Sequence, residues 1–196
     1  MRRPAAAPGL VLLALVTAGA LTPALAQAQP AQQPGAADPP PVSVTGWRFQ
    51  KGANDVYVFY CEQPQCVPGS KVSYRLYANN APVVSLEEFR RQQEQVAKLL
   101  QERGPAGMKV QILGVEGDNK TERPALIKSI RLHTMADGTQ EYGHSGIIMG
   151  KKLDASVISS SRDQNAAKVN YAQFAAGVAV YAQALAPGTK SLEKKK

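Results

Sequence analysis

The chain has 196 residues, of which 44% are hydrophobic and 19% are charged. This length and composition suffice for one domain with a hydrophobic core, and they exclude a wholly disordered chain, a collagen-like repeat and a multi-pass membrane protein. The formal net charge of +8 favours solubility, and because no basic stripe with interleaved aromatic residues is present, we expect no nucleic-acid partner.

Residues 1–26 have the pattern of a secretory signal peptide. Two arginines precede an uncharged, mostly apolar run over 9–21, which is too short to span a membrane comfortably. Overlapping Ala-x-Ala patterns fit cleavage after Ala26 or Ala28. We therefore expect a periplasmic or secreted protein with a mature charge of about +6 after the loss of two arginines, and with no transmembrane segment in the mature chain.

Residues 27–41 are rich in Pro, Ala and Gln and offer almost nothing to bury, which predicts a disordered spacer. The patterned part of the chain begins near residue 42 and ends near residue 187. Residues 188–196 are polar and end in three lysines, which predicts a flexible basic tail. We expect one globular domain over 42–187.

Seven segments of the domain have the composition of β-strands. The segment 70–78 shows the clearest alternation, with Val72, Tyr74 and Leu76 on one face and polar residues on the other. Gly-containing turns predict a hairpin between the first two strands and another around Asp137. The predicted strands are 44–50, 56–61, 70–78, 108–115, 125–135, 141–152 and 155–160.

Two further segments have the periodicity of amphipathic helices. The first is capped by Ser85 with Glu three residues on, and it stops at Gly104. The second runs over 163–185, where Gly177 indicates a close approach to the sheet. Their apolar positions are Leu86, Phe89, Val96 and Leu100 in the first helix and Tyr171, Phe174, Val178, Tyr181 and Leu185 in the second.

The order of elements is therefore β-β-β-α-β-β-β-β-α. Short turns between strands favour antiparallel pairing, and two amphipathic helices need a sheet to bury their apolar faces. We expect an α+β fold with a single antiparallel β-sheet and two amphipathic helices packed on it. Over roughly 44–186 this order is similar to that of small exported or lumenal domains of the PsbP/Mog1 type. The resemblance lies in element order alone and implies no function.

Cys61 and Cys66 stand at the end of a predicted strand, separated by four residues. In an oxidising compartment two thiols this close are expected to form a structural disulfide. A redox-active pair typically has the spacing Cys-x-x-Cys at a helix N-terminus, which this segment lacks. Free or metal-linked thiols and a redox role remain the alternatives.

His133 and His144 are the only histidines, and they lie on neighbouring predicted strands where they can face each other across the hairpin. A metal site would need a third ligand, for which Glu141 and Asp137 are the nearest candidates. Because no spacing typical of metal ligands is present, we expect neither a metal nor a cofactor.

The segment 143–146, Gly-His-Ser-Gly, has the beginning of a nucleophile turn. Such a turn needs a second glycine two residues after the serine, and this chain has Ile147 there. The segment also continues into a predicted strand rather than a helix. We therefore expect no catalytic residue from this motif.

Two classes of function remain open. Because no set of reactive groups converges, the sequence favours a non-enzymatic binding or interaction domain of the bacterial envelope, with an unknown envelope protein or ligand as its partner. Binding residues are commonly found on loops, which makes 61–70 and 143–152 the candidate segments. The alternative is a redox or hydrolytic enzyme that uses the cysteine pair or the region of His133, His144 and Ser145.

Overall fold

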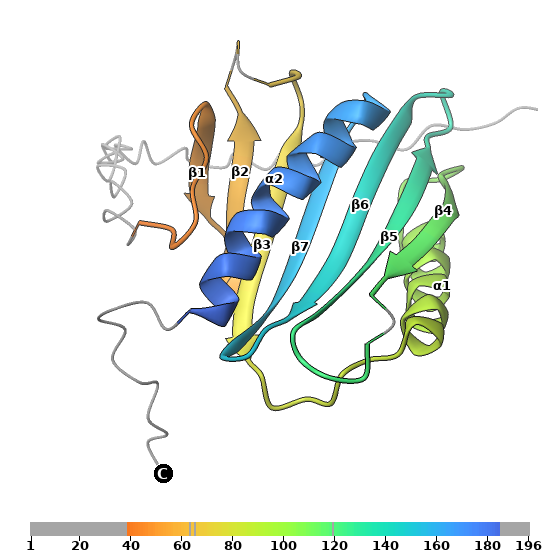
Figure 1. Cartoon of the computed structure of the whole chain (residues 1–196). Helices are drawn as coiled ribbons and strands as arrows, with labels where there is room; N and C mark the ends of the chain where they lie inside the picture. Colours follow the sequence, from red (N-terminus) through yellow and green to blue (C-terminus); the bar gives the residue numbers. More distant parts are fainter. Residues whose placement is uncertain (1–38, 63, 65, 119, 185–196) are drawn as a thin grey trace, which may run out of the picture. The chain divides into compact units, whose positions relative to one another are not determined.

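Residues 39–184, except 63, 65 and 119, are described by a computed structural model (Figure 1). All of them belong to one unit of the chain, Ala37–Lys196. The predicted signal peptide 1–26, most of the spacer 27–41 and the tail 188–196 lie outside the described residues. Within the described residues, neither helix is long and apolar enough to cross a membrane.

Seven strands form one antiparallel sheet in the order β1-β2-β3-β7-β6-β5-β4. This confirms the α+β class and the expected element order. Each strand pairs with a strand next to it in sequence, except that β3 pairs with β7 and thereby joins the two halves of the sheet. The strands are β1 (Trp47–Lys51), β2 (Tyr57–Cys61), β3 (Lys71–Ala78), β4 (Lys109–Gly117), β5 (Ala125–Thr134), β6 (Gln140–Met149) and β7 (Leu153–Ser161), with a 3-10 turn, η1 (Ala53–Asp55), between the first two.

The helices α1 (Leu86–Arg103) and α2 (Gln164–Gln183) cover opposite faces of this sheet (Figure 1). Ile148 of β6 belongs to the core under α2, whereas the next residue, Met149, belongs to the core beside α1. Successive strand residues point to opposite faces, so the two helices do not share a core. The expected cap of α1 is confirmed, because the Ser85 Oγ accepts the backbone N–H of Glu88 at 3.1 Å.

The larger core lies under α2, which packs on β7, β6 and β3. The predicted aromatic stripe is buried there, with Tyr171, Phe174 and Val178 against the sheet. Trp47 of β1 packs edge-on against Phe174, with 5.3 Å between ring centroids. The last predicted position of the stripe, Leu185, lies outside the described residues. The interpretation of this stripe as core is therefore confirmed for Tyr171, Phe174 and Val178, whereas Tyr181 is only half-buried.

The prediction for Gly177 is wrong in its partner. A Cβ at this position would lie 2.8 Å from Cγ1 of Val42, so the close approach is to the segment that precedes β1 and not to the sheet. A helix does approach the sheet closely at Gly146 of β6, since a Cβ there would clash with the Tyr171 hydroxyl of α2.

The smaller core lies under α1, and its buried face differs from the predicted one. Gln93 and Ala97 are buried with Phe89, whereas the other predicted apolar residues of the helix are only half-buried. Gln93 tolerates burial because its Oε1 accepts a hydrogen bond from the Ser129 hydroxyl at 2.9 Å. The periodicity of apolar residues cannot predict that Gln93 is buried, because its burial depends on a hydrogen-bond partner in another element.

Because α1 packs on β4 and β5, it covers only one half of its sheet face. On the face that carries α1, no described helix packs on the other half, which is formed by β2, β3 and β7. The helix α2 lies over these strands on the opposite face (Figure 1). This half of the sheet face is therefore left without a covering helix among the described residues.

Candidate binding face

The cysteine pair is a disulfide, as expected. Cys61 ends β2 and is bonded to Cys66, with 5.7 Å between the two Cα atoms. The backbone N–H of Cys61 also donates to the carbonyl of Ser70 at 3.1 Å, so the same strand end is held twice. Among the described residues there is no free cysteine, and no group of three or more His, Cys, Asp or Glu side chains is placed to hold a metal ion.

The structure does not bring the two histidines together. His144 is paired across β5 with Ile130 and faces α2, whereas His133 is paired with Glu141 and faces the opposite side of the sheet. Ser145 follows His144 directly in the strand and therefore points away from it. The expected approach of the histidines across the hairpin is wrong, because their positions differ by an odd number of steps in the register.

The segment 143–152 is also not an exposed loop. Most of it forms β6, which lies inside the sheet between β5 and β7. The prediction of a binding loop over this segment is therefore wrong. The described part of the loop 61–70 remains on the surface, beside the disulfide.

His144 lies in a closed polar cluster under α2. It is 2% exposed, its ring centroid lies 5.8 Å from that of Tyr171, and neither ring nitrogen has a hydrogen-bond partner in the described chain. Ser159, Asn170 and Tyr171 contribute further buried polar atoms without partners. Burial lowers the pKa of His144 and raises that of Tyr171, so both side chains are held neutral. Catalysis by a serine needs a hydrogen bond from nucleophile to base, which this cluster does not contain.

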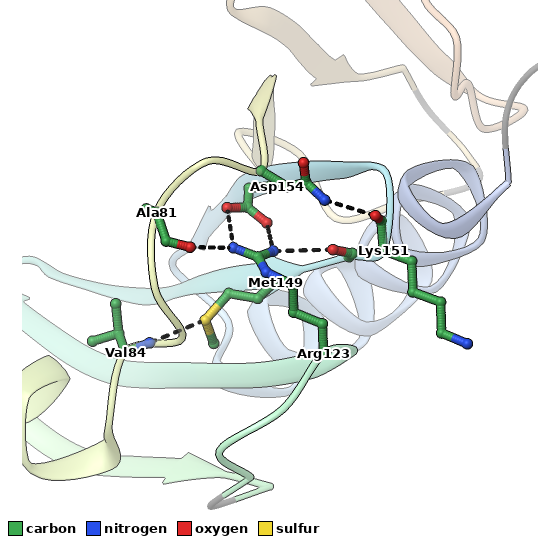
Figure 2. Close-up of polar contacts among 8 residues, drawn as sticks. Ala81, Val84, Arg123, Met149, Lys151 and Asp154 are labelled. Atoms are coloured by element: carbon green, nitrogen blue, oxygen red, sulfur yellow. Dashed lines mark hydrogen bonds and ion pairs between the residues drawn. The ribbon is translucent and has the colours of Figure 1, made fainter.

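A buried ion pair between Arg123 and Asp154 has a structural role. The guanidinium of Arg123, in the loop before β5, forms a bidentate ion pair with the buried carboxylate of Asp154 in β7 (Figure 2). The same guanidinium donates to the carbonyls of Gly150, at 3.0 Å, and Ala81, at 2.6 Å. It therefore ties its own loop to three segments: strand β7, the turn between β6 and β7, and the segment that leads into α1.

The uncovered half of the sheet face combines apolar and basic side chains. Its positions follow from the register, which places alternate residues of neighbouring strands on the same side. We call this surface the open face. It consists of Val58 and Tyr60 from β2, Lys71, Ser73 and Arg75 from β3, and Ser156, Ile158 and Ser160 from β7.

The centre of the open face is apolar and slightly hollowed. Ile158 is 45% exposed, although it sits in an interior strand of the sheet. It borders an open hollow of about 210 Å³. The lining also includes Val56, Val58, Lys71, Ser73 and Ser160. An exposed apolar centre with a polar rim is typical of an interaction surface.

The rim of the open face is positively charged. Lys71 and Arg75 are exposed, and neither forms an ion pair with another described residue. Towards β1, Arg48 is paired with Glu62 at 3.3 Å. The two cations of β3 thus stand on either side of Ser73 without a counter-charge among the described residues.

The comparisons with known proteins assign no family. No protein-family model matches the chain, and no curated protein matches it.

Proposed function

We propose that this protein is an exported, non-enzymatic binding domain of the bacterial envelope, and that its open face docks an acidic segment of another protein. The observation that carries the proposal is the exposure of Ile158 on an interior strand, beside a hollow and between the unpaired cations Lys71 and Arg75. A sheet face with no partner is expected to expose neither a large apolar side chain at its centre nor two cations without counter-charges beside it.

The size of the hollow supports a side chain as its occupant. Pockets for drug-sized ligands have volumes of about 300–1,000 Å³, whereas this hollow measures about 210 Å³ and is open to solvent. It suits one apolar side chain of a partner. Carboxylates on either side of that side chain would meet Lys71 and Arg75.

The reactive residues give the enzymatic alternative little support. His133 and His144 lie on opposite faces of the sheet, and the two thiols are joined in a disulfide. A hydrolytic or redox site requires such groups to converge or to be free.

A peptide probe tests the binding proposal. A labelled peptide of alternating Glu and Leu is titrated with the protein, and its fluorescence anisotropy is compared with that of a Lys-Leu peptide. We expect saturable binding of the acidic peptide alone, with affinity that falls as salt is raised. The double variant Lys71→Glu/Arg75→Glu loses this binding, whereas the matched variant Arg91→Glu/Lys168→Glu, on the two helices, retains most of it. Equal binding of both peptides would refute the proposal.

Export is tested separately. Cell fractionation locates the protein, and N-terminal sequencing of the recovered chain identifies the cleavage site. We expect a periplasmic or secreted chain that begins after Ala26 or Ala28. An uncleaved chain in the cytoplasm would contradict this part of the proposal.

A further inference from the structure

Arg131 is a buried cation without a counter-ion. It lies in β5 on the same sheet face as α1 and the open face, and only 7% of its surface is exposed. Its Nε and Nη1 atoms are buried and have no hydrogen-bond partner among the described residues. Burial of an unpaired guanidinium is costly, so proteins rarely retain one without a use.

The groups around Arg131 do not neutralise it. His133, two residues on and on the same face, has a pKa lowered by burial and by the charge of Arg131 itself, while Glu141 acts in the opposite direction. From α1, Gln93 faces this region, but its Oε1 already accepts from the Ser129 hydroxyl. No described carboxylate lies within ion-pair distance of Arg131.

The register connects Arg131 with the open face. Arg131 is paired with Gly143, Gly143 with Ser160, and Ser160 with Lys71, so these four residues form one transverse row. Strands are about 4.8 Å apart, which places the two cations roughly 14 Å from each other at the Cα atoms. Gly143 leaves the middle of this row without a side chain, and the nearest atom to a Cβ built there is the carbonyl oxygen of Ser159 at 4.0 Å.

We propose that Arg131 is the specificity-determining residue of the open face, and that it binds a carboxylate of the partner over Gly143, with Ser160 and Lys71 on the far side of that carboxylate. This inference rests on the proposed function, since the carboxylate belongs to the same acidic segment. A guanidinium binds carboxylates through pairs of parallel N–H donors. Both atoms without a partner, Nε and Nη1, can take part in such a pair, each in a different one.

The experiment uses N-acetyl-glutamate amide as the probe, with inorganic phosphate as the competing anion. Binding is followed by NMR at constant ionic strength, through the Nε–Hε signal of Arg131 where that residue is present and through the backbone N–H signals of Lys71 and Ser160 in every variant. We expect a saturable shift with the glutamate probe. The variant Arg131→Met weakens binding at least about tenfold, whereas Arg91→Met, which removes an exposed charge of α1, does not. Gly143→Val fills the gap in the row and also abolishes the shift.

Stability separates a binding role from a structural one. If Arg131 is kept for a ligand, Arg131→Met removes an uncompensated buried charge, and the ligand-free variant melts at the same temperature as the wild type or higher. A lower melting temperature, unchanged binding in Arg131→Met, or a response to phosphate alone would overturn the inference. If Lys71→Glu/Arg75→Glu loses binding of the Glu-Leu peptide while Arg131→Met keeps it, the proposed function holds and the role of Arg131 is refuted.

Discussion

Removal of the Asp154 carboxylate is predicted to be the most destabilising single change to a polar residue of the domain. Asp154 is 2% exposed and pairs with Arg123, whose side chain is itself mostly buried. The replacement Asp154→Asn keeps the shape of the side chain but leaves the guanidinium without its counter-charge. The pKa of an arginine guanidinium lies far above neutral pH, so Arg123 stays charged when its partner is lost.

The expected magnitude follows from burial and from the remaining contacts. Loss of one partner of a buried ion pair costs about 3–5 kcal/mol. Arg123 still donates to the carbonyls of Ala81 and Gly150, so we expect the lower end, about 3 kcal/mol. For a domain of this size that corresponds to a fall in Tm of about 6–12 °C.

Urea unfolding followed by the fluorescence of Trp47, the single tryptophan, measures this effect. The exposed pair of Lys98 and Glu102 on α1 provides the control, because Glu102→Gln should change the free energy of unfolding by less than about 0.5 kcal/mol. If Asp154→Asn lowers the free energy of unfolding no more than Glu102→Gln does, the ion pair does not hold these segments together.

Three further predictions concern stability. Burial lowers the pKa of His144, so the unfolded chain binds a proton more readily than the folded one. The free energy of unfolding should therefore be constant above the usual histidine pKa of 6.5 and fall as the pH drops below it. In urea titrations across that range, His144→Gln should show a weaker fall. Gly146→Ala should cost about 1–3 kcal/mol through its clash with α2, while Gly143→Ala on the same strand should cost less than about 1 kcal/mol, and equal losses would refute the packing argument. Joint replacement of Cys61 and Cys66 by serine should lower the free energy of unfolding by about 2 kcal/mol without unfolding the domain. A thiol titration of the wild type should find no free thiol before reduction.

The fold was predictable because its signals are local. Alternation over the segment that became β3 places Lys71, Ser73 and Arg75 on one face, and the structure has them there. The cap at Ser85 and the aromatic stripe of α2 are equally local patterns and were also correct. Hydrophobic periodicity reads such features without knowledge of the partner element.

The site was less predictable because it depends on partners that are distant in the sequence. Arg123 and Asp154 are separated by 31 positions, and nothing in the spacing indicates that they meet. The isolation of Arg131 and the exposure of Ile158 depend on which half of a sheet face α1 covers. The histidines were misjudged because the register of β5 and β6 decides which face each residue occupies, and a shift of one residue reverses that face.

Site-specific photo-crosslinking in the cells that produce the protein tests the central claim most directly. A photoreactive amino acid replaces Ile158 in one strain and Val180, which is 69% exposed on α2, in another. We predict that position 158 yields an adduct with an acidic segment of one envelope protein and that position 180 does not. The same adducts from both positions, or none from position 158, would contradict the assignment of the open face as the binding surface.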